Sequence, residues 1–269
     1  MSKKNTSQFG DFESKYTNPQ TAKIAILPIP YDGTSTWVKG ADKGPKAILD
    51  ASYSLEFYDI ETDSEVFRQG IFTEPPVEGF KQPEEMAQVV RQRIEMLLKE
   101  KKFPVLLGGE HSVSIGAIEA MADRYDNLTV LQLDAHSDLR DAYEGSGYNH
   151  ACVMARAKER CQIVQVGIRS MDTGEKANID TERVFFAHDI CDGQDRSWIE
   201  RVISLLSDNI YLTIDLDAFD PSIMPATGTP EPGGMGWYDV IALAKAVCKH
   251  KNLVGFDIRA DQFLAHFRR

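Results

Sequence analysis

Short apolar segments bounded by Gly, Pro or Asp recur along the whole chain. Most are apolar at both alternating sets of positions, which is typical of strands covered by helices on both faces of a parallel sheet. Eight such segments predict β-strands: KIAILPI near residue 25, GIFT at 70, PVLLGG from 104, LTVLQLD from 128, IVQVGIR from 163, VFFAH from 184, IYLTIDLD from 210 and LVGFDI from 253.

Helical patterns separate these segments. In EEMAQVVRQRIEMLLKEKK, apolar residues recur at three- and four-residue intervals, namely Met86, Val89, Val90, Ile94, Leu97 and Leu98. The alternation of strands and helices predicts a three-layer α/β/α domain with a parallel, roughly eight-stranded sheet and right-handed crossovers. Residues 1–22 are expected to form a polar N-terminal arm and residues 23–269 a single domain.

Three clusters of carboxylates and imidazoles follow predicted strands, where ligands gather in sheets of this kind. They stand in the motifs GGEHS, DAHSD and DLDAFDP. Because strand side chains alternate with period two, the acidic and histidine positions of DAHSD share one face, as do the first two aspartates of DLDAFDP. The candidate ligands are therefore His111, Asp134, His136, Asp138, Asp215 and Asp217.

Four carboxylates that converge in a crevice repel one another unless cations lie between them. Two divalent ions would cancel the four charges, so the sequence favours a dinuclear metal site. Any one of these residues alone would more simply be a hydrogen-bonded structural residue. Oxygen-rich ligation with few imidazoles and no thiolate favours Mn²⁺, with Zn²⁺, Co²⁺ and Ni²⁺ as alternatives. Such a pair of ions supplies hydroxide from water, which indicates a hydrolase.

The charge balance narrows the class of partner. Thirty Lys and Arg against 41 Asp and Glu give a net charge of −11, which disfavours nucleic acid and anionic membranes and suits a cationic substrate. No segment approaches the ~18 apolar residues of a membrane span. The start, MSKKNTSQFGDFESKY, lacks a secretory h-region, so the protein is expected in the cytoplasm.

The three motifs resemble the metal-binding motifs of the ureohydrolase family of arginases and agmatinases, in the same order. The run PYDGTSTWVKGADKGPKAI also resembles the opening loop of that family, and TGTPEPGGMGW resembles the loop after its last metal motif. The likeness spans nearly all of residues 23–258. It implies an arginase-like fold, two Mn²⁺ ions per chain, a small guanidino substrate and a homo-oligomer, either a trimer or a hexamer.

The resemblance also implies a role for each site residue. One manganese would be held by His111, Asp134, Asp138 and Asp215, and the other by Asp134, His136, Asp215 and Asp217. His150, in YEGSGYNHAC, matches the family's proton-shuttling histidine, although it could be an ordinary loop residue; Asp138 would help to orient the nucleophile and pass on a proton. Hydroxide would attack the guanidinium carbon, and collapse of the tetrahedral intermediate would release urea and an amine.

The sequence is closer to agmatinases than to arginases. The loop LRDAYEGSGYNH lacks the pattern by which arginases hold an α-carboxylate, which predicts agmatine as substrate and putrescine as product. Guanidinobutyrate and other guanidino acids remain alternatives. Candidates for contact with the substrate tail are Arg140, Asp141, Tyr143, Glu144 and Asn149, each of which could also be a solvated loop residue.

One departure from the family lies near the C-terminus. In the family, the last strand is followed after one further residue by a glutamate that holds the guanidinium, whereas here Arg259 is followed by Ala260. Asp261 is the nearest substitute, and the domain is expected to be shortened at this end. Two alternatives therefore stand beside an active agmatinase: a metal-binding subunit with little turnover, and a different hydrolase on the same metal core, such as a histone-deacetylase-like amidohydrolase.

Overall fold

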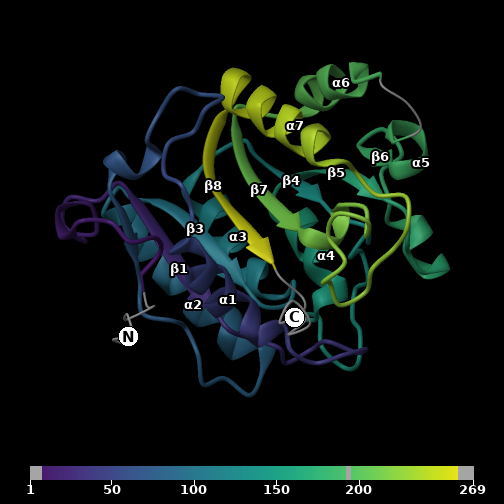
Figure 1. Ribbon diagram of the computed structural model, residues 1–269. Coiled ribbons are helices and arrows are strands. Elements are labelled where there is room, and N and C mark those ends of the chain that lie inside the picture. Colours follow the sequence, from purple (N-terminus) through teal and green to yellow (C-terminus); the bar gives the residue numbers. More distant parts are fainter. Residues whose placement is uncertain (1–7, 192–194, 260–269) are drawn as a thin grey trace.

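The computed structural model describes residues 8–191 and 195–259, which form one eight-stranded sheet with helices on both faces (Figure 1). All strand pairs in the sheet are parallel, and the strand order is β2-β1-β3-β8-β7-β4-β5-β6. The strands are β1 (Ile24–Ile29), β2 (Ile71–Thr73), β3 (Phe103–Gly108), β4 (Leu128–Leu133), β5 (Gln162–Ile168), β6 (Val184–Phe186), β7 (Asn209–Asp215) and β8 (Asn252–Arg259). Each arises from one of the eight predicted segments, so the predicted three-layer parallel fold is confirmed.

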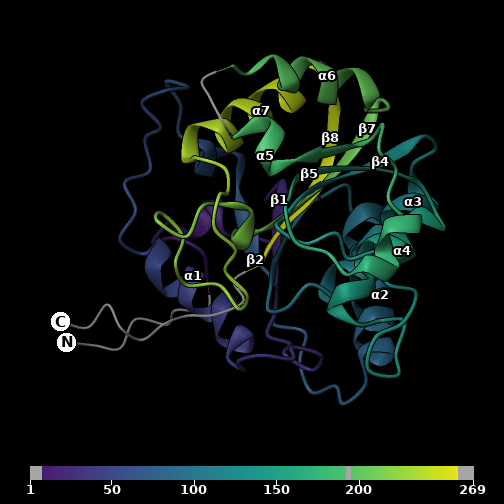
Figure 2. The same cartoon turned by 90° about the vertical axis from the view of Figure 1, so that its right-hand side faces the viewer.

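The helices form two layers, one on each side of the sheet (Figure 2). One layer contains α2 (Pro83–Lys99), α3 (Val113–Arg124) and α4 (Val153–Lys158); the other contains α1 (Gly44–Ser52), α5 (Ala187–Ile190), α6 (Ser197–Leu205) and α7 (Trp237–His250). The predicted apolar stripe of α2 is buried at Met86, Val90, Ile94, Leu97 and Leu98.

The core follows the alternation of side chains along each strand. On β1, Ala25, Leu27 and Ile29 belong to the cluster that packs under α2 and α3, whereas Ile26 joins the cluster under α1 on the other face. Because apolar side chains leave both faces, both helix layers bury apolar surface against the same strand. Within the predicted arm, Phe9 and Phe12 also pack against the cluster under α1.

The four strands at the centre of the sheet position the site. Their order is β3-β8-β7-β4, and the three motifs with candidate ligands begin at or just beyond the ends of β3, β4 and β7. At the end of β3 the chain turns tightly: a Cβ added to Gly109 would lie 2.0 Å from the carbonyl oxygen of Tyr31. Only glycine fits this approach, which brings the opening loop against the metal motif.

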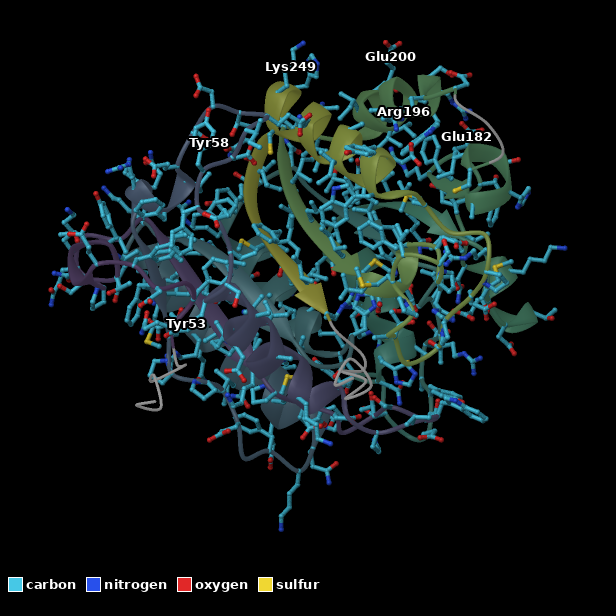
Figure 3. The ribbon with its side chains drawn as sticks, viewed as in Figure 1. Tyr53, Tyr58, Glu182, Arg196, Glu200 and Lys249 are labelled. Carbon is cyan, nitrogen blue, oxygen red and sulfur yellow. The ribbon has the colours of Figure 1, made fainter. Side chains whose placement is uncertain are left out.

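Lys249 on α7 and Glu200 on α6 are exposed and project outward (Figure 3). Among the described residues, no helix is both long enough and apolar enough to cross a membrane. Ala260 and Asp261, on which the expectation about the missing glutamate rests, lie outside the described residues.

Candidate metal centre

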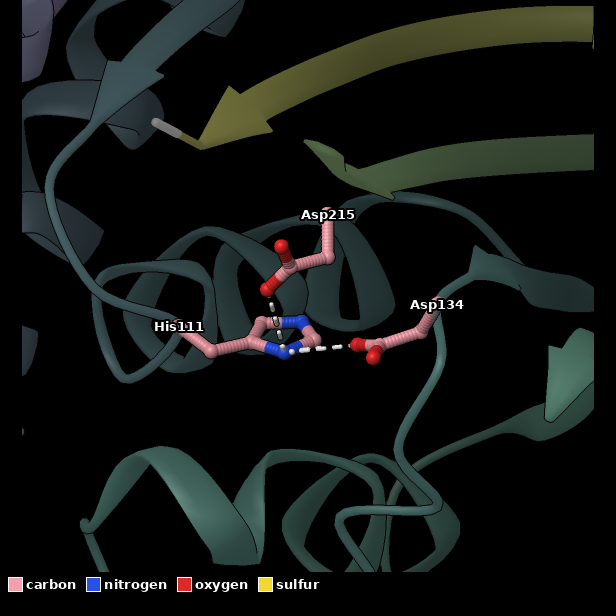
Figure 4. Close-up of side chains that lie close together, drawn as sticks. All are labelled: His111, Asp134 and Asp215. Carbon is pink, nitrogen blue, oxygen red and sulfur yellow. Dashed lines mark ion pairs between the residues drawn. The ribbon is translucent and has the colours of Figure 1, made fainter. Parts of the chain in front are cut away.

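His111, Asp134 and Asp215, which follow the ends of three different strands, form the first cluster (Figure 4), and Asp138 lies against it. His111 Nδ1 lies 2.5 Å from Asp138 Oδ2, 3.1 Å from Asp134 Oδ2 and 3.9 Å from Asp215 Oδ2. All four side chains are buried. His111, Asp134 and Asp215 each place a ligand atom within 4.8 Å of the others, which is close enough to hold one metal ion.

The hydrogen bonds of Thr213, which contacts His111, indicate which ring nitrogen of His111 carries the proton and which one has a free lone pair. Thr213 Oγ1 donates to Asp257 Oδ1 at 2.7 Å and lies 3.4 Å from His111 Nε2. Because that hydroxyl has a single hydrogen, it accepts from Nε2–H and leaves a lone pair on Nδ1. Among the described residues Nδ1 has no hydrogen-bond partner although it is buried. A lone pair surrounded by carboxylate oxygens fits a metal ion.

A second cluster shares Asp134 with the first. His136 Nδ1 lies 3.0 Å from Asp217 Oδ2 and 3.7 Å from Asp134 Oδ1. These three residues also bring their ligand atoms within 4.8 Å of one another. The two clusters together contain every metal ligand predicted from the sequence except Asp138, which contacts His111 directly. The geometry therefore suits two ions with Asp134 between them.

Burial and mutual repulsion disfavour the ionised forms of Asp134 and Asp138. Burial, followed by the charge of Asp217, raises the pKa of Asp134 to about 7. Burial and the charge of Asp134 raise the pKa of Asp138 well above its usual range. Asp138 also has a positive φ of 51°. Residues other than glycine seldom adopt this backbone conformation, and those that do are frequent at functional sites. Cations between these groups would relieve the repulsion.

His150 lies beside the clusters in the same pocket. Its Nδ1 is 3.1 Å from Thr34 Oγ1, and this hydroxyl donates to Glu110 Oε1 at 2.9 Å. With the hydroxyl hydrogen directed to Glu110, Nδ1 carries the proton of His150 and Nε2 remains an acceptor. Burial, followed by the charge of His136, lowers the pKa of His150 to about 4. The imidazole is therefore neutral near pH 7.

The pocket has a volume of about 340 Å³, and all seven predicted site residues line it. Of the five candidates for contact with a substrate tail, only Arg140 and Tyr143 line it. The guanidinium of Arg140 lies 4.3 Å from the ring centroid of Tyr143. Asn149 is buried and instead accepts a hydrogen bond from the backbone of Ala151.

Several supporting residues were not predicted from the sequence. Gln132 donates to Asp134 Oδ2 at 2.8 Å, and Glu175 accepts from Ser137 Oγ at 2.7 Å. Thr213 orients His111 as described above. Gln132 and Thr213 are polar residues inside otherwise apolar strands, and this is the signal that could have identified them, because buried polar groups need partners.

Comparison with known proteins identifies the relatives of this chain. Residues 22–259 match the model of the arginase family. The chain belongs to the arginase family. An N(1)-aminopropylagmatine ureohydrolase of Synechocystis sp. is 37% identical over 254 residues, covering 90% of this chain and 82% of that protein. An agmatinase of Pyrococcus horikoshii is 32% identical over 251 residues, covering 92% of this chain and 87% of its own length.

Solved structures of arginase-family proteins agree with this assignment. The agmatine ureohydrolase of Thermoplasma volcanium superimposes with a TM-score of 0.83 and 31% identity, and covers 94% of this chain and 85% of its own. The arginase-like fold and the agmatinase-like character expected from the motifs are thereby confirmed. This chain is an agmatinase-like member of the arginase family.

Proposed function

We propose that this chain hydrolyses the guanidino group of a linear cationic amine to urea and a primary amine, using two Mn²⁺ ions. Agmatine, which would give putrescine, is the first candidate substrate. The observation that carries the proposal is the pair of clusters that share Asp134 and line one pocket with His150. Family membership and the agmatinase-like relatives support it.

Different residues of the pocket bind the ions, orient the attacking oxygen and transfer the proton. When bound, two divalent ions lower the pKa of a shared water and supply hydroxide near neutral pH. The residues of the two clusters would hold the ions through the atoms described above, namely His111, Asp134, His136, Asp215 and Asp217. Asp138 is positioned beside His111 to orient the attacking oxygen. His150 is neutral and its Nε2 is an acceptor, so it would take up the proton that the attacking water loses and return it to the leaving nitrogen.

The charge of the pocket favours a substrate with no carboxylate. Seven carboxylates line it: Glu110, Asp134, Asp138, Asp172, Glu175, Asp215 and Asp217. Arg140 is the only Lys or Arg among the described lining residues, and it lies 3.8 Å from Asp172 and 3.7 Å from Glu175. Its charge is already balanced, so little remains to bind the α-carboxylate of arginine. A dication such as agmatine suits this lining better.

A panel of guanidino compounds tests the proposed substrate class. We expect urea release from agmatine or its N(1)-aminopropyl derivative to exceed release from arginine and guanidinobutyrate in kcat/KM. Arg140→Gln should widen that preference only slightly, because Asp172 and Glu175 already neutralise the charge of Arg140. Urea assays with all four compounds at equal manganese give the comparison. A preference for arginine or guanidinobutyrate would contradict the substrate assignment.

Ala260 supports a second candidate, a metal-binding homologue with little turnover. A buried charge-assisted hydrogen bond to a guanidinium contributes about 1.5–3 kcal/mol, which corresponds to about ten- to over a hundredfold in binding. We therefore expect Ala260→Glu, or a graft of the loop after Ile258 from an active relative, to raise kcat/KM for agmatine by about tenfold or more. The control is Glu144→Gln, which should change it little. An unchanged kcat/KM after both restorations would show that another residue holds the guanidinium.

Assembly and location belong to the same proposal. The family resemblance supports a homo-oligomer, either a trimer or a hexamer, that acts on a small molecule. The cytoplasm is the location expected from the sequence. Light scattering on the purified chain checks the assembly, and a monomer at micromolar concentration would contradict it.

A further inference from the structure

Arg259 is the last residue of β8 and the largest fully buried side chain among the described residues. In the sheet it pairs with Gly108 of β3 on one side and with Asp215 of β7 on the other. A Cβ added to Gly108 would lie 2.9 Å from Arg259 Cγ. The glycine thus leaves the space that the long side chain occupies at the carboxyl edge of the sheet.

The guanidinium of Arg259 faces carboxylates of the site. Its Nη2 lies 3.8 Å from Asp215 Oδ2, and its Nε lies 3.9 Å from Asp257 Oδ1. Asp215 Oδ2 is also the oxygen that lies 3.9 Å from His111 Nδ1. A single carboxylate oxygen therefore faces both the guanidinium and the ligand nitrogen of the first cluster.

A guanidinium keeps its charge under all ordinary conditions. When it is fully buried, it must be balanced by nearby carboxylates, because an isolated charge in the interior costs many kcal/mol. Asp257 is additionally engaged by the hydroxyls of Thr213 and Tyr211. Asp215 therefore supplies part of the negative charge that balances Arg259. A metal ion in the first cluster would need the same carboxylate of Asp215 as a ligand.

We infer that Arg259 is a built-in cation that competes with the metal ion of the His111–Asp134–Asp215 cluster for Asp215. It thereby lowers the affinity of this cluster for a divalent ion. The Asp134–His136–Asp217 cluster is affected less, because Asp215 is not among its three closely spaced ligands and Arg169, the arginine beside it, binds the backbone carbonyl of Asp217 at 2.6 Å rather than a ligand carboxylate. The inference rests on the proposed dinuclear centre and adds a residue that limits its loading.

Manganese titration of the metal-free full-length chain by calorimetry tests the inference without any activity assay. The His136→Asn background isolates the affected cluster, because the second cluster then lacks its imidazole. We expect Arg259→Met in this background to lower the dissociation constant for Mn²⁺ by about tenfold or more, since an opposite charge within about 4–6 Å changes the proton affinity of a carboxylate by about ten- to a thousandfold.

Three further variants of the His136→Asn protein test whether the charge of Arg259 itself weakens manganese binding. Arg259→Gln, which also removes the charge, should tighten binding as Arg259→Met does, and it replaces the methionine variant if that protein does not fold. Arg259→Lys keeps the charge and should retain the weak binding. Arg140→Met removes a pocket cation that contacts no proposed ligand and should leave the dissociation constant unchanged.

The outcomes separate this inference from the proposed function. If manganese still binds and its dissociation constant is unchanged by both Arg259→Met and Arg259→Gln, the role of Arg259 alone is overturned. Equal tightening by Arg140→Met would also overturn it, because the effect would then be one of overall charge. If neither the natural chain nor any of these variants bound manganese, the dinuclear centre itself would be wrong, and this inference with it.

Discussion

Replacing Asp134 with asparagine is expected to remove both manganese ions together. Its two carboxylate oxygens face different imidazoles: Oδ2 lies 3.1 Å from His111 Nδ1, and Oδ1 lies 3.7 Å from His136 Nδ1. Because one carboxylate serves both clusters, its loss affects both ions. Without them hydroxide is no longer supplied near neutral pH, so urea release should fall on the order of a thousandfold or more.

Elemental analysis of purified protein, after manganese incubation and removal of loose metal, measures the expected change directly. The natural chain should hold two ions and Asp134→Asn close to none. Asp215→Asn, at the other proposed bridge, should behave in the same way, whereas His136→Asn should lose mainly one ion. Asp189→Asn changes an exposed carboxylate outside the pocket and is the matched control. Retention of one full equivalent by Asp134→Asn would contradict its bridging role.

Replacing His150 with alanine is expected to lower turnover by about a hundredfold or more while both ions stay bound, in line with the usual contribution of a positioned proton-transfer group. The structure supports such a role because His150 lies in the pocket with the metal clusters. Burial lowers the pKa of its imidazole to about 4. The imidazole is therefore unprotonated in the free protein at neutral pH and available as a base.

Metal content and turnover measured together decide the role of His150. His188→Ala, which removes an exposed histidine outside the pocket, is the control and should keep full activity. Full activity of His150→Ala would remove this residue from the mechanism. Loss of manganese from it would instead make His150 a structural residue or a ligand.

The strands and most of the metal site could be predicted because their signals are local. A strand that is apolar on both alternating faces indicates cover on both sides, and all eight such segments became strands. A carboxylate or imidazole directly after such a strand must lie at the carboxyl edge of the sheet. The fold therefore brings together three residues that follow different strands, namely His111, Asp134 and Asp215.

The supporting contacts could not be predicted because they depend on strand order. Thr213 reaches both Asp257 and His111 only because β8, the last strand in sequence, lies between β3 and β7 in the sheet. No periodicity in the sequence states that order. For the same reason nothing in the sequence indicates that Arg259 lies between Gly108 and Asp215 in the sheet.

The protonation state of His150 could not be predicted from the residues near it in the sequence. Its sequence neighbours are those of an ordinary polar loop, which gives no sign that the imidazole is buried. Its hydrogen bond to Thr34 joins residues 116 positions apart, and its burial follows from that packing. Burial of this kind lowers the pKa of a histidine, so the value of about 4 emerges only from the fold.

Urea release from agmatine in ¹⁸O-labelled water, with manganese-loaded protein in excess over substrate, tests the central claim most directly. Single-turnover conditions detect the reaction even if Ala260 makes binding weak. The proposed chemistry predicts urea and putrescine in equal amounts, with one ¹⁸O in the urea and none in the amine, and no product from Asp134→Asn. The absence of labelled urea from agmatine and its N(1)-aminopropyl derivative, in protein that holds two manganese ions, would contradict it.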